Sequence, residues 1–138
     1  MIPLTLDNTN LKKLMLTNAQ VNNDGALAIS VALKTNKTLE VLHLETNNIG
    51  PEGILAFAEA IKVNVGLQEL KMTNQSVAIA ITVEKTLAAS FDGNQTIVKF
   101  TSPGRDPGSL SVIDRAVTRN AETGLVSRPS FPFWKSVC

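Results

Sequence analysis

The stretch LEVLHLETNNIGPEGILAFAEAI, residues 39–61, joins two patterns that predict different secondary structures. Leu39, Leu42 and Leu44 open it, and Asn47 follows eight residues after the first leucine. Alternation of this kind is typical of a short strand with one buried face, to which Leu42 and Leu44 would contribute. The last eight residues carry apolar side chains at i, i+3 and i+7, which predicts a helix. The stretch therefore predicts a strand, a turn and a helix.

The same unit recurs along the chain. Similar stretches begin at Leu11, Leu67 and Ile97, so successive units start 28, 28 and 30 residues apart. Leu-x-x-Leu-x-Leu followed by Asn at this period is the leucine-rich-repeat signature, and such units stack into a solenoid. We predict an α/β fold, a right-handed leucine-rich-repeat solenoid of the ribonuclease-inhibitor type. Its parallel strands would form the concave face and its helices the convex face.

Polar residues mark the turns of each unit. Ala19 and Gln75 stand where the second unit has Asn47, so an asparagine ladder at the strand ends is predicted to be incomplete. Asn18 and Asn74, beside these positions, are candidates for turn chemistry of their own. Each helix is expected to stop near a further asparagine. These asparagines are Asn36, Asn64 and Asn94.

The predicted helices share an apolar pattern, and local residues mark where they begin. Gly25 and Gly53 are expected to relieve backbone strain where a turn enters a helix. Ser111 and Asp114 are predicted to form a capping box for the last helix. The predicted core positions of the helices are Ala26, Ile29 and Leu33, then Ile54, Phe57 and Ile61, then Leu87 and Phe91.

The repeats divide the chain into three parts. Residues 1–124 are predicted to be the repeat domain, with residues 1–10 as the end of a preceding element. Residues 125–138 lack the period and contain two prolines, which predicts a flexible tail. We expect the chain to be the C-terminal part of a longer protein, with a dedicated short protein as the alternative.

Composition argues against several classes of function. The net charge of +1 indicates neither nucleic-acid nor anionic-lipid binding, and the longest apolar runs are too short to cross a bilayer. A single cysteine, Cys138, and the absence of a signal-peptide pattern favour the cytoplasm. His43 is the only histidine, and no nucleophile is predicted to face the pair that it forms with Glu45. We therefore predict no enzyme activity, no metal and no cofactor.

Candidate partner-binding residues come from two places. Alternate strand residues would face outward on the concave side, and the last unit carries basic residues on and before its helix. An ordinary solvated sheet and a solvated basic cap that favours the helix C-terminus are the competing interpretations. The candidates are Lys13, Met15, His43, Glu45, Lys71 and Lys99 on the strands, and Arg105, Arg115 and Arg119 in the last unit.

Several segments together resemble one known family. They are ALKTNKTLEVLHLETNNIGPEGILAFAEAIKVN at 32–64, LKMTNQ at 70–75, and DPGSLSVIDRAVTRN at 106–120, with a 30-residue third unit that runs into IVKF. In these features the chain resembles the C-terminal leucine-rich-repeat domain of tropomodulins and leiomodins. It departs from that family in the apolar SVAIAITV at 76–83 and in the tail sequence NAETGLVSRPSFPFW.

The resemblance implies a function. The family caps the slow-growing pointed end of actin filaments, and its repeat domain forms one of two actin-binding regions. The implied partner is therefore actin, with tropomyosin as a partner only if an N-terminal region exists upstream. The implied mechanism is a steric block of subunit exchange by a cytoskeletal, cytoplasmic protein. The alternative is a general protein-interaction scaffold with a partner other than actin.

Overall fold

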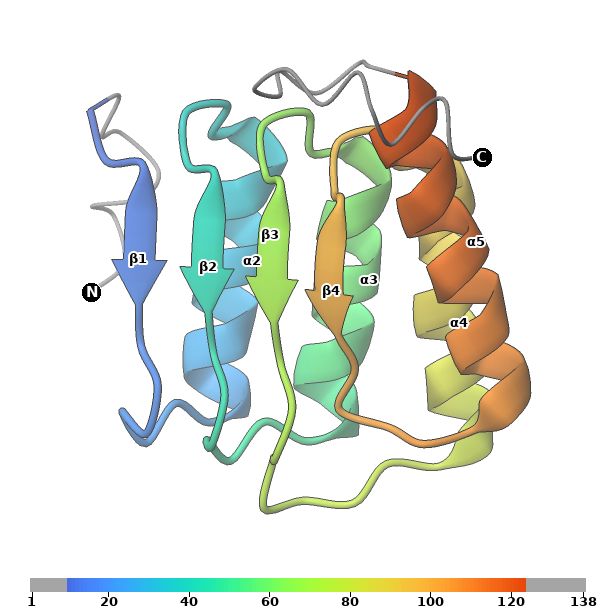
Figure 1. The fold of residues 1–138 in the computed structure, drawn as a ribbon. Helices are drawn as coiled ribbons and strands as arrows, with labels where there is room; N and C mark the ends of the chain where they lie inside the picture. Colours follow the sequence, from blue (N-terminus) through green and yellow to red (C-terminus); the bar gives the residue numbers. More distant parts are fainter. Residues whose placement is uncertain (1–9, 124–138) are drawn as a thin grey trace.

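In the described part of the chain, four short strands form one parallel sheet in the order of the sequence (Figure 1). The computed structural model describes residues 10–123. The strands are β1 (Lys13–Met15), β2 (Val41–His43), β3 (Glu69–Lys71) and β4 (Lys99–Thr101). The predictions made for residues 1–9 and for the tail lie outside the described residues.

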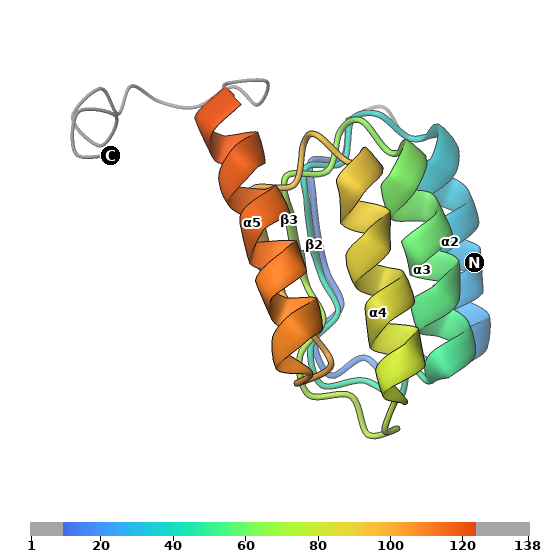
Figure 2. The ribbon, with the colours of Figure 1, turned by 90° about the vertical axis from the view of Figure 1, so that its right-hand side faces the viewer.

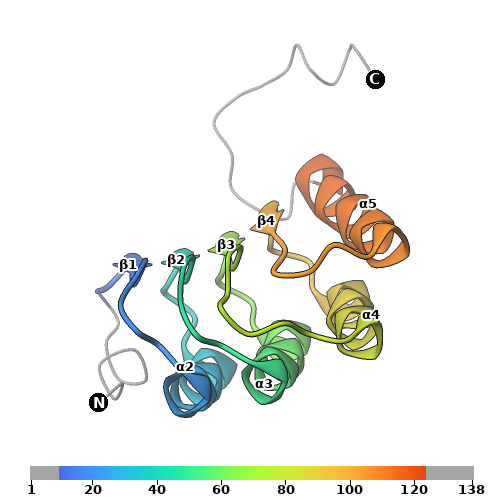
Figure 3. The same cartoon turned by 90° about the horizontal axis from the view of Figure 1, so that it is seen from below.

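The helices form a second layer behind the sheet, with one exception. The elements are α2 (Asn23–Thr35), α3 (Pro51–Val63), α4 (Ile81–Ser90) with its 3-10 continuation η1 (Phe91–Gly93), and α5 (Pro107–Thr123). Helices α2, α3 and α4 stand in a row behind the strands (Figure 3). The last helix, α5, leaves this row and lies beside β4, toward the open side of the sheet (Figures 2 and 3). The predicted α/β repeat architecture is confirmed, and α5 closes its end.

The core lies between the two layers. In register, Leu14, Leu42, Leu70 and Phe100 occupy one row across the four strands. Leu42 and Leu70 are fully buried, as are all of the core positions predicted on the helices. Fully burying an aliphatic side chain contributes roughly 1.5–3 kcal/mol. The aliphatic rows therefore hold the sheet and the helix layer together.

A ladder of asparagines runs along the edge where the helices end. The buried Asn64 accepts the Gly66 and Leu67 N–H groups at 2.9 and 2.7 Å and donates to the Leu33 carbonyl at 2.7 Å. Asn94 repeats this arrangement by donating to the Ile61 carbonyl at 2.9 Å. Each asparagine thus satisfies backbone groups of its own turn and of the preceding unit.

The opposite edge, where the strands end, has a second ladder. The Asn47 carbonyl oxygen accepts the N–H groups of Ala19 and Val21 at 2.9 and 3.0 Å. Gln75 fills the same place one unit later, accepting the Ile49 N–H at 3.1 Å and donating to the Leu44 carbonyl at 2.8 Å. Gln75 therefore does not interrupt the ladder, because its longer side chain still reaches the preceding loop.

The residue before each position of the strand-end ladder has a left-handed backbone conformation. Asn18, Thr46 and Asn74 have φ values of 54°, 58° and 65° at equivalent places in successive units. Asparagine tolerates this conformation better than other residues with a side chain, and β-branched threonine tolerates it poorly. The role of Asn18 and Asn74 in the turns is thus to adopt this backbone conformation, and Asn74 also donates its side-chain amide to the Thr46 hydroxyl at 3.1 Å.

Two local predictions were wrong. Gly53 lies inside α3, where a Cβ would be 2.6 Å from the Ile49 Cγ2 atom, so close packing explains this glycine better than turn strain does. Gly25 likewise lies within α2. The last helix starts at Pro107, and the Asp106 carboxylate caps it by accepting the Ser109 N–H at 2.9 Å and the Ser109 hydroxyl at 2.8 Å.

The predicted capping pair, Ser111 and Asp114, therefore lies within α5 and not at its start. The two bonds from Ser109 also hold the pKa of Asp106 below its ordinary value.

Of the helices in residues 10–123, none is long and apolar enough to span a bilayer.

Candidate functional site

The exposed side of the sheet presents side chains in two cross-strand rows. Pairing between strands places His43 beside Lys71 and Glu69 beside Lys99. Met15 and Lys13 occupy the same rows on β1, where both are exposed. The structure thus brings all the candidate strand residues except Glu45, which follows β2, into one array. The full rows are Lys13, Val41, Glu69 and Lys99, and then Met15, His43, Lys71 and Thr101.

The centre of this array is a hydrogen-bonded ion cluster. His43 Nε2 lies 2.6 Å from Glu69 Oε2, and Lys71 Nζ lies 4.0 Å from the same oxygen. Because a carboxylate only accepts, this imidazole nitrogen carries the proton. The His43 hydrogen bond, together with the charges of Lys99, His43 and Lys71, outweighs burial and lowers the pKa of Glu69. The cluster thus places the Glu69 carboxylate within reach of His43 and Lys71 on the exposed side of the sheet.

The cluster also changes the pairing that the sequence suggested. His43 bonds to Glu69 on the next strand, while the Glu45 carboxylate accepts the Thr73 hydroxyl at 3.5 Å. The set of candidate residues did not include Glu69, although it lies in the same outward row. Within residues 10–123, no group of three His, Cys, Asp or Glu residues is placed to hold a metal ion.

The three candidate arginines of the last unit have different environments. Arg105 and Arg115 are exposed, whereas Arg119 is half-buried. The Arg119 guanidinium donates to the main-chain carbonyls of Phe91 and Asn94 and to the Asn120 side chain. Arg119 is therefore engaged within the fold and is not a free basic side chain.

Arg119 and Asn120 together end the ladder at the helix ends. The buried Asn120 donates at 2.8 Å to the carbonyl of Ile97, the first residue of its own unit, whereas Asn94 and Asn64 donate to residues of their preceding units. The sequence contained this signal, because Asn120 is the next asparagine at the end of a predicted helix. Arg119 and Asn120, near the end of the last helix, thus stabilise the end of the fold.

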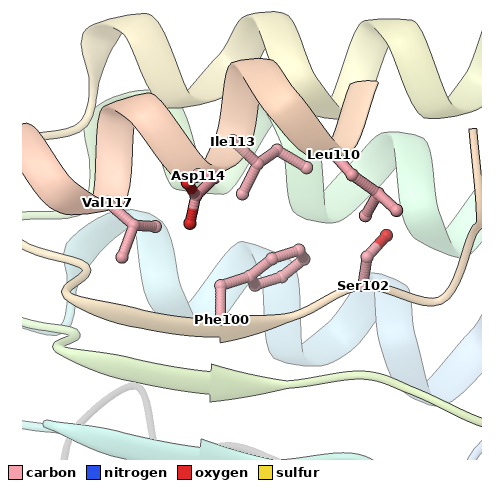
Figure 4. A pocket seen from close by; sticks show the side chains of 6 residues that line it. All are labelled: Phe100, Ser102, Leu110, Ile113, Asp114 and Val117. Atoms are coloured by element: carbon pink, nitrogen blue, oxygen red, sulfur yellow. The ribbon is translucent and has the colours of Figure 1, made fainter. Parts of the chain in front are cut away.

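A groove separates β4 from α5. Phe100 forms its floor, and its ring meets Phe91 edge to face with 4.8 Å between centroids. The groove encloses about 340 Å³, and the side chains of α5 point into it from the other wall (Figure 4). Its lining residues are Phe100, Ser102, Leu110, Ile113, Asp114 and Val117.

A second, more polar depression lies between the loops of the third and fourth units. It encloses about 410 Å³ and is bordered by Arg105, Gln75 and Thr73, among others. Arg105 follows Ile97 by eight residues, which is the place of Asn47 and Gln75 in the earlier units. The strand-end ladder therefore stops at this depression, where the last unit presents a cation.

Comparison with known proteins decides the family. Residues 2–123 match the family model described as the TMOD/LMOD leucine-rich domain. The chain belongs to the tropomodulin/leiomodin family of leucine-rich domains. A search of curated protein sequences finds no match.

Solved structures of the tropomodulin/leiomodin family agree with this assignment. Leiomodin-1 actin-binding site 2 is 30% identical, with a TM-score of 0.84 over 88% of this chain and 70% of that one. The tropomodulin C-terminal domain of Caenorhabditis elegans is 18% identical, with a TM-score of 0.63 over 88% of this chain and 92% of that one. At that identity the second likeness supports the fold alone.

Proposed function

We propose that this tropomodulin/leiomodin domain is a non-enzymatic, cytoskeletal actin-binding module that slows subunit exchange at filament pointed ends by steric block. The observation that carries the proposal is the match to the solved structure of leiomodin-1 actin-binding site 2, over most of this chain. Family membership over residues 2–123 supports the same role. A rigid solenoid suits a steric mechanism, because it offers an extended, preformed surface to a protein partner.

Two surfaces are the proposed contacts. One is the concave array around the His43–Glu69 pair, with Lys99 and Lys71 adding positive charge. The other is the exposed basic pair of the last unit, Arg105 and Arg115. Actin has an acidic surface in large part, so exposed cations would steer association and favour its retention. Arg119 is excluded from this role by its hydrogen bonds to the preceding unit.

The test is an elongation and shortening experiment on filaments blocked at their fast-growing end, with the protein titrated in. We expect subunit exchange at the free pointed ends to slow at micromolar concentration or below. Arg115→Glu should weaken this effect while leaving the thermal midpoint unchanged. Lys34→Glu, a charge reversal on the exposed surface of α2, is the matched control and should behave as the unmodified chain does.

Co-sedimentation with filaments separates the remaining outcomes. Side binding without slower exchange would overturn the capping mechanism but retain actin as the partner. No binding at all would overturn the proposal in favour of a repeat scaffold with another protein partner. Equal effects of Arg115→Glu and Lys34→Glu would remove the α5 surface from the proposed contact.

A further inference from the structure

The groove between β4 and α5 exposes apolar side chains at the end of the solenoid. Leu110 is 38% exposed, and Phe100 on the floor and Val117 on the α5 wall are half-buried. Between inner units, the next unit covers such surfaces. No element within residues 10–123 covers this groove, because β4 is the last strand and α5 forms the opposite wall (Figures 3 and 4).

We propose that residues 131–134 of the same chain, Phe-Pro-Phe-Trp, dock in the groove between β4 and α5. Three of the six Phe and Trp residues of the chain lie in these four positions. Aromatic side chains gain most from leaving water and meet other aromatic rings favourably. Phe100 offers such a ring on the floor, and the volume of about 340 Å³ suits one or two aromatic side chains.

The segment is attached at the right place to reach the groove. It follows α5 after seven residues, and the groove residues on α5 begin six residues before the end of the helix, at Val117. A helix rises ~1.5 Å per residue, so the groove spans roughly 9 to 20 Å back from Thr123. The seven residues 124–130 can extend to roughly 23 Å. The aromatic segment can therefore return antiparallel to α5 and lie along the groove.

Charge and backbone preference agree with this occupant. Among residues 10–123, Asp114 is the only charged residue that lines the groove, and it is exposed. Arg128 and Lys135 flank the aromatic segment, so a cation stands on either side of it. Pro129 and Pro132 restrict the backbone to extended conformations, which reduces the entropy lost when a short peptide docks beside aromatic rings.

Docking within one chain does not depend on actin, so this inference goes beyond the proposed function. Trp134 is the only tryptophan, which makes its fluorescence a specific probe of the segment. In the intact chain we expect a blue-shifted emission maximum and a several-fold lower acrylamide quenching constant than for a free peptide of residues 124–138. Leu110→Asp should shift both values toward those of the free peptide.

The matched control is Leu27→Asp on α2, at the other end of the solenoid. Leu27 is 43% exposed, close to the value for Leu110, so the two substitutions place the same charge on similarly exposed helix positions. Leu27→Asp should leave Trp134 protected. Circular dichroism of both variants verifies that each is folded.

Three results would overturn the proposal. The first is a Trp134 that is quenched as readily in the intact chain as in the peptide. The second is an equal response to Leu110→Asp and Leu27→Asp. The third is protection that disappears on dilution while the fold persists, which would assign the groove to a second copy of the chain.

Discussion

The two edges of the solenoid treat their turns differently. At the helix-end edge, Asn36, Asn64 and Asn94 directly follow the helices of the first three units. Asn120 stands in the last turn of α5, and Arg119 beside it adds two hydrogen bonds at the end of the series. Where strands end, Asn47 and Gln75 bridge successive loops, and then Arg105 follows. Within residues 10–123, the Arg105 side chain makes no hydrogen bond or ion pair, and it borders a polar depression.

The helix-end edge therefore stabilises the fold, whereas the strand-end edge offers an exposed surface. At the helix-end edge, buried carbonyl and N–H groups depend on one side chain type with a donor and an acceptor at fixed places. At the strand-end edge, the last unit leaves both a cation and a depression open to solvent. A partner can be recognised there without breaking the hydrogen bonds on which the fold depends.

The largest expected effect on stability is at the helix-end edge. Asn64→Ala leaves the Leu33 carbonyl and the Gly66 and Leu67 N–H groups without their partner, which should cost roughly 2–4 kcal/mol of unfolding free energy. Gln75→Ala, at the strand-end edge, should cost only about 1 kcal/mol of unfolding free energy, because its surroundings are partly hydrated. Urea titrations measure both values. Equal costs would remove the distinction between the edges.

Substitution of Arg119, at the end of the helix-end edge, should have an intermediate effect on stability. Arg119→Ala removes the donors to the Phe91 and Asn94 carbonyls and should cost roughly 1–2 kcal/mol. Arg115→Ala, four residues earlier on the exposed surface of α5, should change stability by less than about 0.5 kcal/mol. Thermal unfolding of the two variants decides this. If Arg119→Ala unfolds with the midpoint of Arg115→Ala, Arg119 does not close the ladder.

A smaller effect is expected between the edges, on the concave face. The pKa of Glu69 lies below its ordinary value of 4.5, so its contribution to stability is present above that pH and is lost as pH falls through the lowered pKa. The size should be that of a partly exposed ion pair, roughly 0.2–1 kcal/mol. The stability difference between the native chain and Glu69→Gln should therefore shrink between neutral pH and pH 3. A difference that stays constant with pH would contradict the predicted role of the His43–Glu69 pair.

The smallest effect on stability is expected in the turns of the strand-end edge. Thr46 has a φ of 58°, whereas the equivalent residues of the neighbouring units are asparagines. Thr46→Asn should raise the unfolding free energy by about 0.5 kcal/mol, because asparagine adopts this conformation at lower cost. Differential scanning calorimetry with Thr46→Val as the comparison measures it. A lower midpoint for Thr46→Asn would show that the threonine hydroxyl, which accepts the Asn74 amide at 3.1 Å, outweighs the backbone preference.

The sequence by itself determined the repeat, the order of elements and most of the core. A period of 28 residues and the alternation around Leu42 are local patterns, and local patterns set which side chains face inward. The same patterns placed Lys13, Met15, His43, Lys71 and Lys99 on one outward surface.

Only the tertiary structure decided which of these side chains are free. Glu69 is the partner of His43, 26 positions away, and Arg119 bonds to Asn94, 25 positions away. The departure of α5 from the helix row, which forms the groove against β4, is equally non-local (Figure 3). Such contacts join adjacent units across space, so the spacing of residues within one unit carries no direct record of them.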